Sequence, residues 1–293
     1  MTSPAANRLG RIGIWTAELN STEPAHRAQI TEAAAELEEL GYGTVWLGSG
    51  PPLAAVTAVL GATERITAAT GILSIWSHEA KDLAAFTAET ERRTPGRFVL
   101  GLGVSHGPLA PRYAKPYTRM TAYLGELDDA PEPVPAQNRI LAALGPRMLR
   151  LAAERALGAH PYLVTSGYIA EARSLLGPGA LLAPELMVIL DTDPDRARAT
   201  ARDALAFYLT LPNYSGNLLR LGFAESDFDG GGSDRLLDAL FALGDTEHAA
   251  ARVGEFLAAG ADHVCVQVLS AGGDGVVPSR AAWRELAEAL PLG

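Results

Sequence analysis

The feature that most constrains this chain's fold is a series of eight short apolar segments, most of them separated by segments with helical periodicity. Within each apolar segment the hydrophobic residues do not alternate with polar ones, which is typical of parallel strands buried on both faces. Between the segments, apolar residues recur every three to four positions, as in amphipathic helices. The expected strands cover residues 12–15, 44–47, 66–73, 98–104, 139–144, 160–164, 186–190 and 263–269.

The helical segments complete a repeating strand–helix order. The first helix is expected to end at Gly41, and the helix after the fifth strand is expected to begin near Pro146. The other helices are expected to cover residues 52–62, 80–93, 170–176, 194–211 and 279–290. Eight such units predict a closed (β/α)8 TIM barrel, whose functional loops lie where each strand leads into the next helix. We expect one domain over residues 1–293, and a doubly wound open sheet is the alternative.

Two long stretches interrupt the regular spacing. Residues 105–137, after the fourth strand, are rich in Pro, Tyr and Arg, and residues 212–245 follow the seventh unit. Long loops inside a compact domain are often functional. We therefore expect insertions after strands 4 and 7 that contribute to a site.

The charge and cysteine content exclude several classes of partner. The formal net charge of −10 argues against nucleic acid and against anionic membranes, which both attract basic surfaces. No secretory signal is visible, and no apolar run approaches the ~20 residues that span a bilayer. We expect a cytoplasmic protein with a small-molecule substrate. The single cysteine, Cys265, lies in an apolar run and is expected to be a buried thiol.

Common catalytic motifs are missing. The sequence contains no Walker-type phosphate loop, no HExxH zinc pair and no nucleophile elbow, and its six histidines lack ligand spacing. Gly101 and Gly103 end the fourth strand, but the third glycine of a dinucleotide fingerprint is replaced by His106. This argues against a Rossmann-type NAD site.

Small and polar residues gather where the third, fourth and fifth strands end. Small residues at the mouth of a barrel let the backbone approach a ligand closely. Gly145-Pro146 would start a helix whose free N–H groups suit an anion such as phosphate, and Arg147 could add charge. Gly-Pro is also ordinary at helix starts, and His106 could be a solvated loop histidine, so these residues alone leave the function open.

Four stretches of the sequence together resemble a known family. They are Leu-Gly-Tyr-Gly-Thr-Val-Trp-Leu at 40–47, Ala-Thr-Glu-Arg-Ile at 62–66 with Thr-Gly-Ile at 70–72, Thr-Pro-Gly-Arg-Phe-Val-Leu-Gly-Leu-Gly at 94–103, and Gly-Asp-Thr at 244–246 with Ala-Ala-Gly-Ala-Asp-His-Val at 258–264. In this order they resemble the luciferase-like monooxygenase superfamily, and most closely its F420-dependent oxidoreductase branch.

The resemblance implies a tricyclic cofactor, coenzyme F420 or alternatively FMN, lying in the mouth of the barrel. It implies a non-prolyl cis peptide or a bulge between Gly71 and Ile72, whose role in the family is to press on the middle ring. It also implies that the loop at 143–148 holds the cofactor's chain and phosphate. The cofactor-binding residues expected on this basis are Gly71, Ile72, Val104, Ser105, Ala143, Leu144, Gly145, Pro146, Arg147 and Met148.

The catalytic assignment also comes from the resemblance. His106 matches the position where some F420-dependent relatives carry a glutamate acid, so we expect it to donate or accept a proton during hydride transfer. Relatives that oxidise sugar phosphates carry an Asp-His pair after the second strand, where this chain has Ser49-Gly50. This departure disfavours sugar-phosphate oxidation, and a small carbonyl or unsaturated substrate is easier to accommodate.

Substrate contacts are expected from residues on or near the mouth-side loops: Trp15, Trp76, His78, Tyr113, Tyr117, Tyr168, Asn213 and Tyr214. A wall of aromatic side chains would suit a flat, apolar substrate. Two functions remain as alternatives to an F420-dependent oxidoreductase. One is an FMN-dependent monooxygenase, and the other is a barrel that binds cofactor without catalysis. Relatives commonly form homodimers, and the Ala-rich helix at 80–93 could pack closely in a homodimer.

Overall fold

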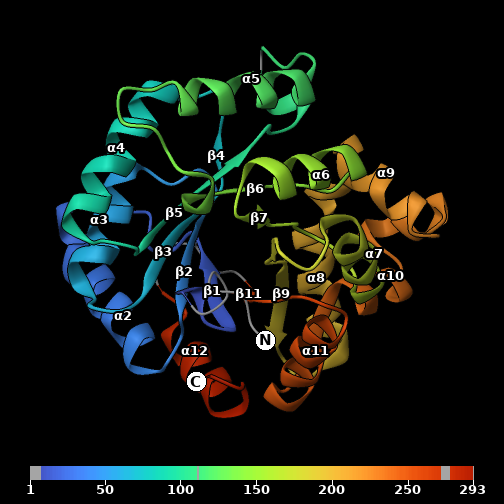
Figure 1. Ribbon diagram of the computed structural model, residues 1–293. Coiled ribbons are helices and arrows are strands. Elements are labelled where there is room, and N and C mark those ends of the chain that lie inside the picture. The colour runs from blue at the N-terminus through green and yellow to red at the C-terminus, as the bar shows by residue number, and fades with distance from the viewer. Residues whose placement is uncertain (1–7, 111, 272–277, 293) are drawn as a thin grey trace.

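The computed structural model describes residues 8–110, 112–271 and 278–292. Its strands form a parallel sheet wrapped around a central axis, with helices on the outside (Figure 1). The sheet contains the strands β1 (Ile12–Thr16), β2 (Thr44–Gly48), β3 (Thr67–Gly71), β4 (Leu73–Ser74), β5 (Phe98–Gly103), β6 (Arg139–Leu141), β7 (Gly158–Ala159), β8 (Leu181–Leu182), β9 (Glu185–Leu190), β10 (Phe241–Gly244) and β11 (Val264–Val268).

The segment formed by β8 and β9 closes the barrel. β8 pairs with β7, and β9 pairs with β11, so the two ends of the strand order β11-β1-β2-β3-β5-β6-β7 meet on this one segment. Between β8 and β9 the backbone remains bonded on both sides: the N–H of Ala183 donates to Ala159 and the N–H of Cys265 donates to Pro184. This closure confirms the expected (β/α)8 barrel over the open sheet. β10 pairs with β9 beyond the closure.

The outer helices bury one face each against the sheet. They are α2 (Arg27–Glu39), α3 (Leu53–Ala62), α4 (Ala80–Arg93), α6 (Pro146–Arg155), α7 (Ser166–Leu176), α8 (Pro194–Leu209), α11 (Thr246–Ala258) and α12 (Arg280–Ala289). Leu37 of α2, Val56 of α3 and Phe256 of α11 are examples of the apolar side chains that pack on the strands. Inside the barrel, Trp46 and Val99 pack with Ile140 and Cys265, so the interior at these residues is a filled core.

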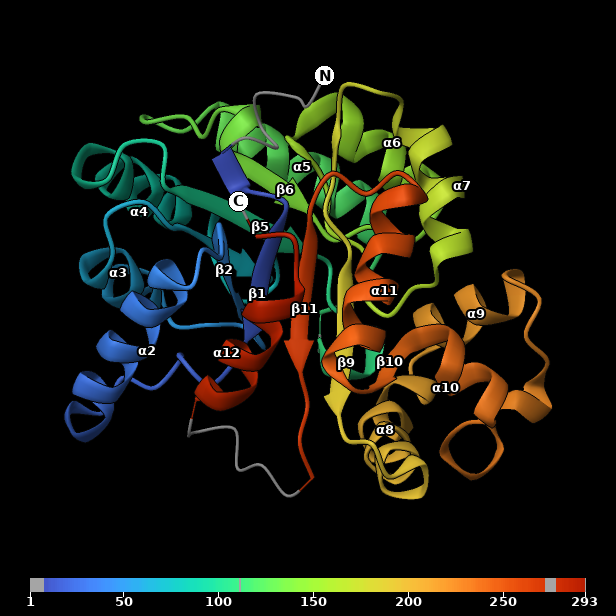
Figure 2. The same ribbon diagram turned by 90° about the horizontal axis from the view of Figure 1, so that it is seen from below.

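Both long stretches contain helices. The stretch after β5 contains the short helix η2 (Gly107–Leu109), α5 (Pro116–Asp128) and η3 (Ala136–Asn138). The stretch after α8 contains α9 (Pro212–Arg220), η4 (Glu225–Gly231) and α10 (Asp234–Leu240). In Figure 2 the arrows of β9 and β11 point toward the end of the barrel where α8, α9 and α10 lie. The expected insertions are therefore real, and the second one lies at the carboxyl ends of the strands.

The sixth strand was predicted in the wrong place. The structure puts it at Gly158–Ala159, whereas residues 160–164 form an irregular segment in which Leu163 has a positive φ of 55°. Two small residues give no visible apolar pattern, while Leu163 and Val164 are buried without being in a strand. α11 was also missed, although Asp245 caps it by accepting from the N–H of His248.

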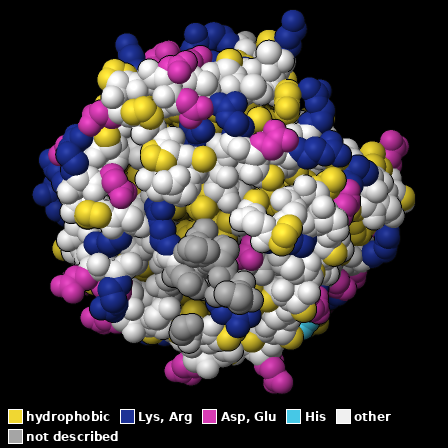
Figure 3. Space-filling view, viewed as in Figure 1, with side chains coloured by type: hydrophobic (Ala, Val, Ile, Leu, Met, Phe, Trp, Pro, Cys, Tyr) yellow, Lys and Arg dark blue, Asp and Glu magenta, His cyan; other side chains and the backbone are white. Residues whose placement is uncertain are grey.

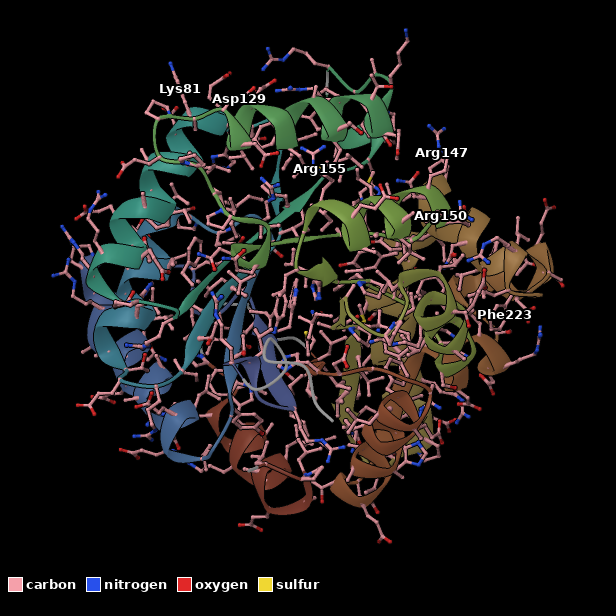
Figure 4. All side chains as sticks on the ribbon, viewed as in Figure 1. Lys81, Asp129, Arg147, Arg150, Arg155 and Phe223 are labelled. Atoms are coloured by element: carbon pink, nitrogen blue, oxygen red, sulfur yellow. The ribbon has the colours of Figure 1, made fainter. Side chains whose placement is uncertain are left out.

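Several expectations about the chain as a whole meet structural facts. Cys265 is a free, buried thiol, as expected. No helix in the described ranges is long and apolar enough to span a bilayer. The face seen in Figure 3 carries acidic and basic side chains close together, without one large area of a single sign. Lys81 on α4 and Asp129 after α5 point to solvent in Figure 4. That α4 packs against a second copy of the chain in a homodimer stays a prediction.

Candidate functional site

A cavity of about 790 Å³ opens at the carboxyl ends of the barrel strands. Its walls come from residues that follow β2, β3, β5, β6 and β7, and from both insertions. The volume is in the range that holds cofactors and drug-sized ligands. The barrel topology predicted a site at this end, and the cavity lies there.

The expected cofactor-binding residues all line this one cavity. They are Gly71, Ile72, Val104, Ser105, Ala143, Leu144, Gly145, Pro146, Arg147 and Met148. They come from three separate strand ends, so the fold brings together residues that are far apart in sequence. Their role in binding a cofactor remains a prediction.

The backbone after β3 has the feature that the resemblance implied. The peptide bond between Gly71 and Ile72 is cis. Just before it, the hydroxyl of Thr70 accepts from the N–H of Gly101 at 2.8 Å and donates to the carbonyl of Gly101 at 2.9 Å. The pairing with β5 then resumes through β4, where Leu73 lies opposite Leu102. The side chain of Thr70 therefore bridges the interruption in the ladder at the cavity wall.

The start of α6 offers free backbone donors and one cation. Gly145 is the N-cap and has no side chain to bond the first-turn N–H groups, which leaves donors for an anion. Arg147 is exposed, and its guanidinium carbon lies 4.1 Å from the centre of the Tyr117 ring. Figure 4 shows Arg147 and Arg150 projecting from this helix. Among the described lining residues, Arg147 is the only Lys or Arg.

His106 lies at the cavity wall beside the second insertion. It follows Ser105, whose φ of 56° is left-handed, and it occupies the N-cap position of η2 without a side-chain capping bond. The amide nitrogen of Asn213 lies 3.3 Å from its Nδ1, and the ring of Tyr214 lies 5.1 Å from its ring. Since an amide N–H only donates, Nδ1 accepts and the neutral ring carries its proton on Nε2. Burial lowers the pKa of His106, so the imidazole is neutral at pH 7.

Some expected substrate residues lie in the cavity wall and others lie outside it. Trp15, Tyr113, Tyr117, Asn213 and Tyr214 line the cavity. The other three, Trp76, His78 and Tyr168, are not among its lining residues.

Two of the three residues outside the wall, Trp76 and Tyr168, contact residues that line it. The indole N–H of Trp76 donates to the carbonyl of Val104, and its ring packs on Tyr113. The hydroxyl of Tyr168 lies 3.1 Å and 3.0 Å from the carbonyls of Ala143 and Leu144, and the ring is fully buried. His78 is partly buried after β4. Direct substrate contact by these three side chains stays a prediction, and they do not line the cavity of this structure.

Several lining residues were not expected from the sequence. The rings of Tyr162, Tyr208 and Tyr214 pack together at one wall, and the Tyr162 hydroxyl lies 2.9 Å from Oε1 of Gln267. Phe207 and Leu109 lie at the cavity with 51% of their surface exposed. These side chains make the opening apolar.

The residues at the Asp-His position of the sugar-phosphate relatives also lie in the wall. Ser49 and Gly50 line the cavity directly after β2, and both have a positive φ. Neither residue carries an acid or a base, and in the described residues no cluster of three His, Cys, Asp or Glu side chains could hold a metal ion.

His160 is the lining residue that the sequence interpretation missed most clearly. It follows β7 directly and is 2% exposed, with its ring stacked 4.3 Å from that of Trp46. The strand expected at 160–164 would put it at the beginning of a strand, hence at the far end of the barrel. A strand ending at Ala159 puts it at the cavity instead.

Comparison with known proteins agrees with this geometry. Residues 11–127 match the family model described as luciferase-like monooxygenase, which confirms the resemblance stated from the sequence. An F420-dependent secondary alcohol dehydrogenase in complex with an F420-acetone adduct has 14% identity and a TM-score of 0.71, with 96% of this chain and 98% of that chain covered.

Two further solved structures have the same fold. The coenzyme F420-dependent tetrahydromethanopterin reductase from Methanopyrus kandleri has 16% identity and a TM-score of 0.69, covering 96% and 99% of the two chains. The oxygenating constituent of 3,6-diketocamphane monooxygenase from Pseudomonas putida, in complex with FMN, has 13% identity and a TM-score of 0.65, covering 96% and 99%. No curated protein matches the sequence. The chain thus has the α/β-barrel fold of these structures.

Proposed function

We propose that this protein is an F420-dependent oxidoreductase that transfers a hydride between the deazaflavin ring and a small organic substrate, a carbonyl or an activated alkene or alcohol. The observation that carries the proposal is the convergence of the ten expected cofactor residues and His106 on one cavity. The cavity fits a planar cofactor because it has an uncapped helix start at one side and unpaired buried polar atoms at its floor.

The roles of the chain's own residues follow from their positions. The first turn of α6 and Arg147 bind the phosphate of the cofactor, because backbone N–H groups and a guanidinium both stabilise an anion. Ser105 and the backbone at Gly71–Ile72 form the wall against the ring. Tyr168 holds the carbonyls of Ala143 and Leu144 from behind.

When bound, a deazaflavin supplies or accepts a hydride at its ring carbon. The substrate oxygen must then gain or lose a proton, and His106 is the group beside the cavity that can exchange one near neutral pH. In alcohol oxidation the neutral imidazole accepts the hydroxyl proton on Nδ1, where the substrate hydroxyl replaces the hydrogen bond from Asn213. In carbonyl reduction the protonated imidazole returns it. The apolar side chains of Leu109 and Phe207 at the opening favour an apolar substrate.

An FMN-dependent monooxygenase is the second candidate, because one of the structures with this fold contains FMN. Among the described lining residues Arg147 is the one Lys or Arg, and it lies at the start of α6, where the phosphate of either cofactor would bind.

Equilibrium titration of the purified protein with oxidised F420 and with FMN tests the proposal. We expect F420 to bind more tightly, and Arg147→Ala to weaken binding by about tenfold, the loss of one charge-assisted hydrogen bond. Arg150→Ala on the same helix is the matched control, since Arg150 does not line the cavity. Tight binding of FMN without binding of F420 would reverse the choice of cofactor. Binding without turnover of any alcohol, ketone or enone would favour a barrel that has lost catalysis.

A further inference from the structure

Two polar atoms at the floor of the cavity are buried without hydrogen-bond partners. They are Nε1 of Trp15, on β1, and Nε2 of His160, after β7. The side chains belong to residues that are 6% and 2% exposed, and both residues line the cavity. A buried donor or acceptor left unpaired costs about 1–3 kcal/mol, so such atoms in a binding cavity mark groups that a ligand can satisfy.

Both atoms converge over Gly71. A methyl group built at Gly71 would lie 2.6 Å from Nε1 of Trp15 and 3.5 Å from Nε2 of His160. Gly71 lies opposite Gly48 in the pairing of β2 with β3, and a methyl group at Gly48 would lie 2.6 Å from Cε2 of Trp15. The indole therefore lies against both glycines, and its nitrogen and the imidazole nitrogen both lie close to Gly71.

The hydrogen-bonding character of each atom is fixed. Nδ1 of His160 lies 2.7 Å from the carbonyl of Ala183, which can only accept, so Nδ1 carries the proton. Burial lowers the pKa of His160 to about 4, so the ring is neutral and Nε2 is an acceptor. Nε1 of Trp15 is a donor only. The floor thus presents one acceptor and one donor, both close to Gly71.

The second buried histidine of the barrel interior differs from His160 in this respect. Nδ1 of His263 lies 2.8 Å from the carbonyl of Gly10, and its Nε2 lies 3.0 Å from Nε1 of Trp46. Both of its nitrogens are paired, and it does not line the cavity. The unpaired nitrogen of His160 is therefore not a general property of histidines in this barrel, and it occurs where the cavity begins.

We infer that Trp15 and His160 together bind an imide or lactam edge, in which a ligand N–H donates to Nε2 of His160 and the neighbouring C=O accepts from Nε1 of Trp15. A carboxylate would place a second acceptor against the His160 lone pair, and a simple ketone would leave that lone pair unpaired. The inference rests on the proposed function, because the rings of F420 and FMN both end in a pyrimidinedione with this order of groups. In this arrangement the pyrimidinedione edge of the cofactor would face the barrel floor, and the cofactor's chain would extend toward α6.

Methylation of the ligand's imide nitrogen tests the inference in the unchanged protein. The probes are whichever of oxidised F420 and FMN binds, and its N3-methyl analogue, compared by equilibrium titration. We expect the analogue to bind about tenfold more weakly, because it cannot donate and leaves Nε2 of His160 unpaired. In His160→Leu the parent should lose affinity and the ratio between parent and analogue should approach one.

Controls separate this contact from steric effects and from the proposed function. His78→Leu makes the same substitution outside the cavity lining and should keep the wild-type ratio. Equal binding of parent and analogue to the wild-type protein would overturn the inference and leave the proposed function standing. An equal loss in wild type and His160→Leu would overturn the role of His160. Binding of neither parent cofactor would overturn the proposed function and the inference with it.

Discussion

Replacing Gly48 with alanine should disturb the cavity floor through one side chain. The added methyl would lie 2.6 Å from Cε2 of Trp15 and closer still to Cζ2 and Cη2 of the same ring. The indole is rigid, 6% exposed, and packed 5.5 Å from the ring of Tyr162, so it cannot move aside freely. The φ of Gly48 is not positive, so the effect comes from this overlap rather than from the backbone.

The magnitude follows from two opposing terms. Overpacking of a filled site costs about 1–3 kcal/mol. Alanine in a strand regains about 0.5–1 kcal/mol relative to glycine. We therefore expect a net loss of about 1–2 kcal/mol, which lowers Tm by about 2–4 °C in a chain of this length. Because the displaced indole closes the floor of the cavity, affinity for the cofactor should fall in the same variant.

Thermal unfolding and cofactor titration of a double-mutant cycle measure this effect. Trp15→Leu removes the ring that collides, so Gly48→Ala should cost less in that background, with a coupling of about 1 kcal/mol. Gly61→Ala is the control, because a methyl group there meets nothing within 4 Å and Gly61 lies in α3. A Gly48→Ala protein with wild-type stability and affinity, or strictly additive losses in the cycle, would refute the packing argument.

Three further predictions concern the proton partner and one partly exposed ion pair. His106→Ala should lower kcat by about 100-fold or more while the cofactor Kd stays unchanged, and an equally active variant would dismiss the role. Asn213→Asp should raise the pKa of His106, since a carboxylate stabilises the imidazolium. Because alcohol oxidation uses the neutral ring, activity should be lost at a higher pH than in the wild type as the pH falls. An unshifted pH profile would contradict this. Burial acts to raise the pKa of Asp128, but hydrogen bonds from Arg139 and Arg155 hold it below its ordinary value. Asp128→Asn should therefore cost about 1–2 kcal/mol in urea unfolding at pH 7, a moderate value because the carboxylate is partly exposed, and the difference from wild type should shrink as pH falls through the lowered pKa.

The sequence was sufficient to predict elements whose apolar residues recur regularly over several turns. The helix at 80–93 was predicted to the residue, because its buried positions Leu83, Ala84 and Thr87 recur at helical spacing. The sequence failed where the element was too short to show a period: β7 has two residues, and its neighbours Leu163 and Val164 are buried without being in a strand.

The candidate site divides in the same way. Loops that follow a strand were placed at the cavity correctly, since the topology alone puts the carboxyl ends of parallel strands on one face. The direction of single side chains was not predictable. Tyr168 lies in the first turn of α7 and turns under the loop at 143–148, and Trp76 bonds Val104 from behind. His160 was missed because a shift of two residues in a strand boundary moves a side chain from one end of the barrel to the other.

A crystal structure of the protein with oxidised F420 tests the central claim most directly. The account predicts the tricyclic ring against the Gly71–Ile72 peptide, the phosphate at the first turn of α6, and His106 beside the reactive ring carbon. Electron density for the cofactor elsewhere on the protein, or a cavity that stays empty at saturating F420 and at saturating FMN, would contradict it.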